Sequence, residues 1–201
     1  AVVLAREDTF PDALGASALT TDVDGPLLLT PPDRLSSDTR QEIARVLGDG
    51  GSVYLLGGDV ALSAEVEDAL DELGYRTPRF PGADRIQTAG MIARFVGVGP
   101  RDEVLLVRAS GNPDLEQGWV DSVSCGGYAA FSGTPVLLTR TESATVADES
   151  LATLDQLGAR RVHVCGGPLA VPDAQLDQLR AAGYEVERHA GETRADTAVA
   201  V

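Results

Sequence analysis

The sequence predicts an α/β fold of Rossmann-like layered parallel sheets, arranged as two tandem homologous repeats. Short, uniformly apolar runs alternate with longer amphipathic stretches, which indicates strands and helices that alternate along the chain. Strands that are apolar on both faces are typical of a parallel sheet with helices above and below it. The whole pattern then recurs 109 residues later, which indicates a duplication.

The first copy is expected to follow the order βαβαβαβα. Pro26 opens the second strand, where a missing N–H costs least. Ser36 or Ser37 can cap the second helix and Ser63 the third, and Gly74 can end that third helix. The expected elements, in chain order, are strand 2–4, helix 10–21, strand 27–29, a helix through 47, strand 53–56, a helix through 73, strand 75–80 and a helix from 84 through 95.

The duplication is seen in specific residue matches. The run Pro-Leu-Leu-Leu-Thr at 26–30 returns as Pro-Val-Leu-Leu-Thr at 135–139, and no gap is needed from 10 to 94. Upstream of that stretch, the second copy is expected to carry a five-residue insertion within 110–118. We therefore expect two repeats, residues 1–98 and 101–201, packed through apolar surface.

Charge and composition exclude several function classes. All 16 basic residues are arginine, against 31 acidic residues, for a net charge of −15. Such a chain lacks the basic stripe that nucleic acid binding needs. Without lysine it has no P-loop lysine and no Schiff-base lysine. No apolar run approaches the ~20 residues of a membrane span.

The cysteines and histidines leave alternatives open. Cys125 and Cys165, 40 residues apart, are either two small buried side chains or one disulfide. His163 and His189 are either half-buried structural residues or general bases, and no motif supplies a nucleophile and an orienting partner for a base. No metal-ligand spacing, dinucleotide fingerprint or other cofactor motif is present. We therefore expect no catalytic residue, no cofactor and no metal.

Four motifs occur in order and twice, and together they resemble the cell wall binding repeat 2 family. In the first copy they span residues 10–14, 25–30, 53–58 and 82–89, and the second copy departs from them at Trp119 and at 192–193. The resemblance implies a non-catalytic, extracellular module at the cell wall or cell surface. It would anchor a secreted protein by binding a secondary cell wall polymer, either a polysaccharide or a teichoic-acid-like chain. The alternative is a Rossmann-like enzyme that acts on a small substrate in the cleft between the repeats.

The resemblance also implies partners of the same kind, because family members commonly carry three repeats around a pseudo-threefold axis. A chain with two repeats is expected to self-associate or to pack beside a third repeat. Its final helix, near 194–201, is expected either to pack beside a neighbouring unit or to be frayed.

Candidate ligand-binding residues lie at the carboxyl ends of the expected strands, where ligands bind in such sheets. The Gly-Gly pairs either cradle an anion or let strand and helix pack closely. Arg85 and Arg194 form either an inter-repeat ion pair or a ligand contact. Asp12 and Asp121 either cap their helices or face the ligand. The complete candidate set is Asp12, Thr30, Gly57, Gly58, Asp84, Arg85, Asp121, Thr139, Gly166, Gly167 and Arg194.

Overall fold

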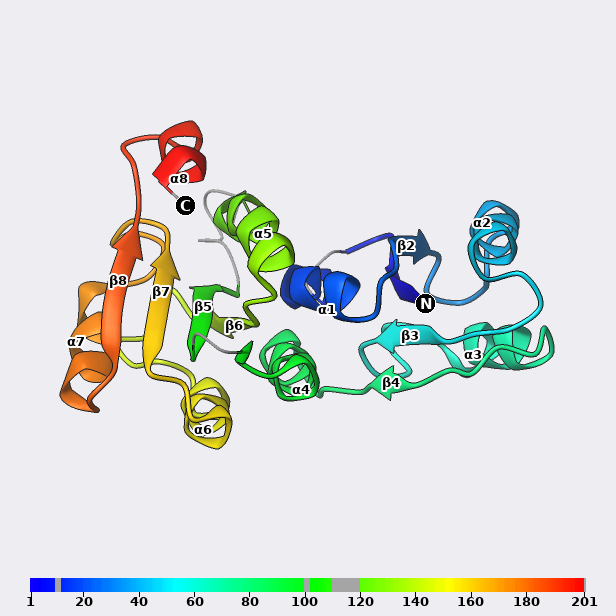
Figure 1. Ribbon diagram of the computed structural model, residues 1–201, viewed down its shortest axis with the longest axis horizontal. Helices are drawn as coiled ribbons and strands as arrows, with labels where there is room; N and C mark the ends of the chain where they lie inside the picture. Colours follow the sequence, from blue (N-terminus) through cyan, green and yellow to red (C-terminus); the bar gives the residue numbers. More distant parts are fainter. Residues whose placement is uncertain (10–11, 100–101, 110–119, 201) are drawn as a thin grey trace.

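Two four-stranded parallel sheets form the molecule and lie side by side along its long axis (Figure 1). The computed structural model describes residues 1–9, 12–99, 102–109 and 120–200, and of 120–122 and 194 it describes the backbone only. The strand orders are β2-β1-β3-β4 and β6-β5-β7-β8, which are the same order in the two copies. The predicted α/β class with two tandem repeats is therefore confirmed.

The elements alternate along the chain as predicted. In the first copy they are β1 (Val2–Arg6), η1 (Ala13–Gly15), α1 (Ser17–Asp22), β2 (Leu27–Thr30), α2 (Ser37–Leu47), β3 (Val53–Leu56), α3 (Ala64–Asp71), β4 (Arg79–Phe80) and α4 (Arg85–Val96). In the second they are β5 (Glu103–Arg108), α5 (Val120–Ser132), β6 (Val136–Thr139), α6 (Asp148–Leu157), β7 (Arg161–Cys165), α7 (Asp173–Ala181), β8 (Glu185–His189) and α8 (Arg194–Ala200).

Two elements of the first copy are shorter than predicted. The expected helix 10–21 is divided into η1 and α1. Between them the backbone at Gly15 packs closely on Ala89, where a Cβ on the glycine would lie 2.9 Å from the alanine Cβ. The expected strand 75–80 is reduced to Arg79–Phe80. Pro78 has no N–H to donate, and before it only an isolated bridge between Ser52 and Arg76 continues the pairing.

The strand register corrects the predicted insertion. Val3 pairs with Leu27, and Leu105 pairs with Val136, so β1 and β5 are offset by 102 residues while β2 and β6 are offset by 109. The second copy is therefore longer by seven residues between β5 and α5, and not by five. The expected position of this insertion, 110–118, lies outside the described residues.

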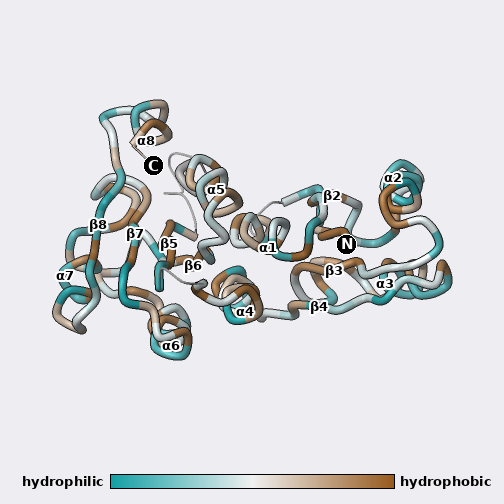
Figure 2. Tube along the Cα trace, in the orientation of Figure 1, coloured by the Kyte–Doolittle hydropathy of each residue, from teal (hydrophilic) through white to brown (hydrophobic). Residues whose placement is uncertain are grey.

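Apolar residues gather on the strands and on the helices between the sheets, while α2, α3, α6 and α7 carry more polar residues (Figure 2). On one face of the first sheet, Val2 and Leu4 pack with Ile43 and Leu70 from α2 and α3. The central helices α1, α4 and α5 lie between the two sheets (Figure 1). This arrangement buries the central strands β1 and β5 on both faces, as a parallel sheet requires, whereas the edge strand β2 leaves Leu29 exposed.

Helix α4 contributes to the cores of both copies. Ile92 packs with Val3 and Phe80 of the first sheet. Within the two turns before it, Ile86 and Ala89 pack in the cluster that contains Leu105 and Val107 of the second sheet. The last helix that sequence position assigns to the first copy is thus a layer shared by the two sheets.

Cys125 and Cys165 form a disulfide that joins α5 to the end of β7. Both side chains are fully buried, so the cysteines are core residues as well as a cross-link. Their counterparts in the first copy, Ala16 and Leu56, pack in one apolar cluster. The disulfide therefore replaces an apolar contact at the same place in the fold.

Candidate functional site

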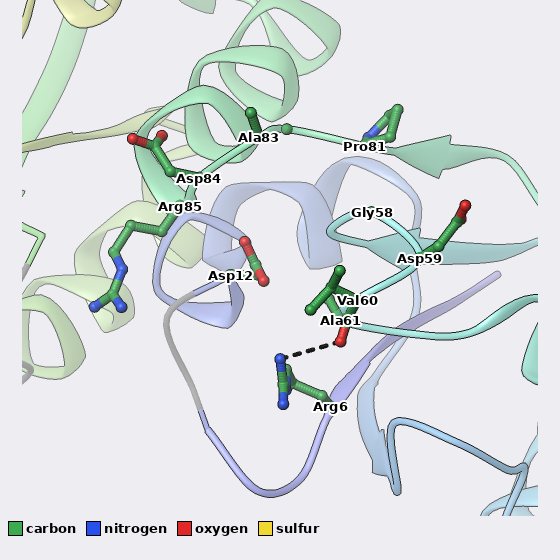
Figure 3. Close-up of a pocket in the computed structure, with 11 residues that line it drawn as sticks. Arg6, Asp12, Gly58, Asp59, Val60, Ala61, Pro81, Ala83, Asp84 and Arg85 are labelled. Carbon is green, nitrogen blue, oxygen red and sulfur yellow. Dashed lines mark hydrogen bonds between the residues drawn. The ribbon is translucent and has the colours of Figure 1, made fainter.

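A pocket of about 430 Å³ lies at the carboxyl edge of the first sheet (Figure 3). Segments that follow β1, β3 and β4 form it, because the carboxyl ends of parallel strands meet at one edge of a sheet. The described residues that line it are Arg6, Asp12, Gly58, Asp59, Val60, Ala61, Pro81, Gly82, Ala83, Asp84 and Arg85. Four of the predicted site residues, Asp12, Gly58, Asp84 and Arg85, are therefore brought together here.

Gly57 allows the carboxylate of Asp12 to lie directly against the backbone. Its φ is +88°, and a Cβ would lie 2.9 Å from Asp12 Oδ2 and 2.5 Å from the Cβ of Ala61. Its N–H donates to Phe80 in the sheet, as the N–H of Gly166 donates to His189. The first glycine of each pair thus has its N–H committed to the ladder, which favours close packing over an anion cradle.

Asp12 occupies the N-cap position of η1, but its side chain makes no capping hydrogen bond. The predicted capping role is therefore not seen for Asp12. In Figure 3 its carboxylate lies between Arg85 on one side and the Val60–Ala61 loop on the other. The pKa of the Arg6 guanidinium is raised, chiefly by its hydrogen bond to Asp8. The negative charge of Asp12 makes a smaller contribution in the same direction.

Arg6, at the end of β1, forms one wall of the pocket. It donates two hydrogen bonds of 2.6 Å to the carboxylate of Asp8 and one of 3.3 Å to the carbonyl of Val60. The same pair lowers the pKa of the exposed Asp8 carboxyl. A bidentate pair holds the planar guanidinium in one orientation. Arg6 therefore fixes the Val60 loop, and the site list drawn from the sequence did not include it.

Asp84 and Arg85 connect the pocket to the second copy. One oxygen of Asp84 accepts from the N–H groups of Ile86 and Gln87 and caps α4. The other accepts from Arg140 at 2.9 Å. Arg85 donates to the carbonyl of Ala109 at 2.8 Å. The inter-repeat ion pair exists, but Asp84 makes it, while Arg85 makes an inter-repeat hydrogen bond.

A partly buried arginine holds the Gly-Gly loop in each copy. Arg79 donates to the carbonyls of Gly57 and Leu62 and to the carboxylate of Glu67. Arg188 makes the equivalent bonds to Gly166, Val171 and Asp173. Their recurrence at the offset of 109 residues was visible in the sequence, but the loop they would hold could not be known from it.

Thr30 and Thr139 lie at strand ends but do not line the pocket. Thr30 is fully buried, donates to the carbonyl of Arg34 and accepts from the N–H of Ser36. Thr139 is equally buried and donates to Gln175. Both threonines therefore stabilise the loop that follows their strand, and neither lines this pocket.

The second copy has a different set of side chains at the equivalent edge. Pro168 replaces Asp59, and Thr193 replaces Asp84. Gly166 has a φ of +108° like Gly57, whereas a Cβ at Gly167 would meet open space. The side chains of Asp121 and Arg194 lie outside the described part of the chain. Two carboxylates of the first pocket thus have no counterpart in the second copy.

Neither histidine belongs to the pocket. His163 on β7 and His189 on β8 are in the second sheet, and the residues that line the pocket include no histidine. Burial lowers the pKa of His163, so its ring is neutral at pH 7. A neutral imidazole can accept a proton, but His163 lies outside the pocket and so could not take a proton from a ligand bound there.

The pocket combines donors and acceptors without a large apolar surface. Two guanidinium groups and three carboxylates surround small side chains, and Val60, which is 89% exposed, stands at the rim. Carboxylates accept hydrogen bonds from hydroxyls and guanidinium groups donate them. This arrangement suits a ligand rich in hydroxyl groups.

The profile of the family described as "Cell wall binding domain 2 (CWB2)" matches residues 1–67 and 79–176. The chain belongs to this family. It is therefore a cell wall binding module built from tandem repeats, which confirms the resemblance found in the motifs. Membership of the CWB2 family establishes what kind of module the chain is. The pocket is formed by the side chains of this particular chain.

The CWB2 chain is similar to two curated proteins of Bacillus subtilis (strain 168). It is 28% identical over 193 residues to the "Amidase enhancer", and the matched region covers 96% of this chain and 24% of that protein. It is 26% identical over 177 residues to "N-acetylmuramoyl-L-alanine amidase LytC", and the matched region covers 88% of this chain and 33% of that protein. The chain thus spans a quarter to a third of the length of these relatives.

Two solved structures share the CWB2 fold. Cwp8 from Clostridium difficile superposes with a TM-score of 0.82 at 30% identity, over 99% of this chain and 32% of Cwp8. Cwp6 from the same organism superposes with a TM-score of 0.83 at 20% identity, over 98% of this chain and 30% of Cwp6. The arrangement of the two sheets is therefore shared with Cwp6 and Cwp8.

Proposed function

We propose that this module anchors a secreted protein at the bacterial cell wall by binding a secondary cell wall polymer, without catalysing a reaction. The polymer would be a polysaccharide or a teichoic-acid-like chain, and the module would be extracellular. Family membership and the similarity to an amidase enhancer, an amidase and two cell wall proteins support this proposal. In the described part of the chain no helix has the length and apolar character needed to cross a bilayer.

The pocket of the first copy is the observation that carries the proposal. Its volume of about 430 Å³ falls in the range of small-ligand sites. That size would take a short segment of a polymer and leave the rest of the chain in solvent. Asp12, whose carboxylate makes no capping bond and faces the pocket, would accept hydrogen bonds from the ligand's hydroxyls.

The charge of the protein restricts the polymer. A net charge of −15 repels a polyanion at low salt, and three carboxylates in the pocket add to this repulsion. We therefore expect a hydroxyl-rich segment to occupy the pocket. For a strongly anionic polymer, binding should strengthen as added salt screens the repulsion.

A sedimentation assay tests the proposal. The folded module is mixed with purified wall material before and after its secondary polymers are stripped, across a salt series. Asp12→Asn preserves the size of the side chain but removes its charge, and we expect binding to weaken about tenfold, as for a lost charge-assisted hydrogen bond. Asp22→Asn, at the exposed end of α1, is the matched control.

Three outcomes would contradict this function. Binding could be equal to all insoluble material, absent everywhere, or unchanged after the polymers are stripped. Normal binding by Asp12→Asn would instead leave polymer binding in place and reject this pocket as its location.

We further propose that the repeats, residues 1–98 and 101–201, assemble with another unit of the same kind. Helix α4 lies against the second sheet, and α8 is its counterpart in the second copy. Helices α5 and α8 pack together and expose Phe131 (91%) and Val199 (87%). Apolar side chains of this size are often covered in an assembly.

A specific contact would bury upwards of ~1,000 Å². Light scattering at micromolar concentration should therefore give a mass above that of the monomer. Phe131→Ser should lower that mass if this face is covered. A monomeric mass for the unaltered chain would reject self-association.

A further inference from the structure

The two histidines of the chain meet on neighbouring strands of the second sheet. His163 on β7 lies beside His189 on β8, with 2.9 Å between Nδ1 of His163 and Nε2 of His189. Glu187 pairs with His163 in the strand register and projects from the same face of β8 as His189, two residues later. A Glu187 oxygen lies 3.7 Å from Nδ1 of His163. The three ligand atoms all lie within 4.8 Å of one another.

The proton on His189 is fixed by its other neighbour. Nδ1 of His189 lies 2.9 Å from the carbonyl oxygen of Ala200 in α8. A carbonyl only accepts hydrogen bonds, so Nδ1 must carry the proton. In the neutral ring Nε2 then has a free lone pair, and this lone pair points toward His163.

While both rings are neutral, His163 cannot satisfy both of its nitrogens in this setting. If Nδ1 donates to His189, Nε2 is a bare acceptor that is buried without a hydrogen-bond partner, and the nearby oxygen of Glu103, 3.8 Å away, is also an acceptor. If the proton is on Nε2 instead, it faces Glu103, but two lone pairs then meet at 2.9 Å. The side chain is only 10% exposed, so solvent has little access to it.

A cation between the rings removes this conflict. We propose that His163, His189 and Glu187 bind one Zn²⁺ ion through Nδ1, Nε2 and a carboxylate oxygen. Two imidazoles and one carboxylate, with a water in the fourth position, are a common zinc ligand set. Glu187 is 62% exposed, which leaves one side open to solvent for that water.

The outer groups already have the positions that such a site needs. Metal-bound histidines usually direct their second nitrogen at a carboxylate or a backbone carbonyl, which fixes the ring. Here Nε2 of His163 faces Glu103, and Nδ1 of His189 faces the carbonyl of Ala200. The bound ion would therefore join β7 and the edge strand β8 to the end of α8.

The first copy shows that the fold does not require histidines at this place. The residues equivalent to His163, Glu187 and His189 are Tyr54, Pro78 and Phe80. Tyr54 and Phe80 pack with ring centroids 6.2 Å apart, and Phe95 closes the group. An apolar cluster thus fills the position in one copy and three ligand groups fill it in the other. The first-copy residues are therefore suitable substitutions for the histidines, because the same fold already holds them in the first copy.

Calorimetric titration of the untagged chain with ZnCl₂, after removal of metals by a chelator, tests the site. We expect one ion per chain and a midpoint of thermal unfolding that rises with zinc concentration, because the ion binds the folded state. Substitution of both histidines by the first-copy residues, His163→Tyr with His189→Phe, should abolish binding. Glu187→Gln should weaken it at least tenfold. Asp177→Asn on the exposed face of α7 should leave it unchanged, which separates the site from the general acidity of the chain.

Several results would overturn the proposal. They are no binding by the unaltered chain, undiminished binding by the double histidine variant, and undiminished binding by Glu187→Gln. The last variant changes an exposed side chain and should fold normally, so it decides the matter if the double variant is unfolded. Equal binding of Ca²⁺, which prefers oxygen ligands, would indicate an acidic surface site instead and would also reject the proposal.

Discussion

Arg140 of the second copy donates a hydrogen bond of 2.9 Å to Asp84 of the first, whose other oxygen caps α4. One carboxylate therefore fixes the start of the shared helix and ties it to the neighbouring sheet. Both side chains of the pair are about 40% exposed, so the pair itself is partly screened by solvent. The cap and the ion pair should contribute separately to stability.

We expect Arg140→Gln to lower the free energy of unfolding by about 0.5–1 kcal/mol, because it removes only a partly exposed ion pair. Asp84→Ala removes the pair and the cap, and should cost about 2 kcal/mol. Urea denaturation at low and high salt measures both, and Arg180→Gln, in an exposed pair on α7, is the control. Equal losses for Arg140→Gln and Asp84→Ala would show that the cap contributes nothing.

The two glycines after β3 should differ in their tolerance of alanine. Gly57→Ala places a Cβ against Asp12 and Ala61 at a positive φ, so we expect a loss of at least about 1 kcal/mol and a displaced Asp12 carboxylate. Gly58→Ala meets only the carbonyl of Gly82 at 4.0 Å and should cost less than about 0.5 kcal/mol. Thermal unfolding and the wall-binding assay can be run on both variants. A Gly57→Ala protein as stable as Gly58→Ala would contradict this account of the loop.

Loss of the Cys125–Cys165 disulfide should destabilise the second copy. A cross-link that closes a loop of 40 residues is worth about 3–4 kcal/mol in the chain-entropy account. Denaturation with and without a reductant measures this difference. Cys125→Ala with Cys165→Leu, which restores the residues found at Ala16 and Leu56, should recover part of the loss through apolar packing. No effect of the reductant would show that the cross-link does not form in solution.

Tyr184 should ionise later than an ordinary tyrosine. Burial raises the pKa of Tyr184 to about 12, and its hydrogen bond to Asp155 acts in the same direction. Because the folded pKa lies above the unfolded value of about 10, the stabilisation is complete below pH 10 and is lost as the pH rises toward 12. Tyrosinate absorbance during an alkaline titration should include a late step from Tyr184. Tyr184→Phe should remove that step, and a late step that persists in this variant would refute the assignment.

The sequence predicted the repeat and the alternation of elements because apolar periodicity and the constant offset are local properties of the chain. It could not show that Ile86 and Ile92, six residues apart on α4, face different cores, because an amphipathic pattern does not name the sheet it covers. The pocket was half predicted for a similar reason. Position at a strand end selected Asp12 and Asp84, which line the pocket, but it also selected Thr30, whose side chain is fully buried.

The metal-ligand group was missed for a different reason. His163 and Glu187 are brought together by strand pairing and not by spacing in the sequence. A motif search that looks for closely spaced ligands therefore passes over them. Comparison of the two copies was the available signal, because Tyr54 and Phe80 are replaced by histidine together.

The double membership of α4 has a consequence for how the protein melts. If the first sheet opens, Ile92 loses its partners, and Ile86 and Ala89 on the same helix are loosened from the second sheet. Neither copy can unfold without disturbing α4, which packs in the core of the other copy. The two copies should therefore unfold in a single cooperative transition. A destabilising substitution in one copy should lower the free energy of unfolding of the whole chain.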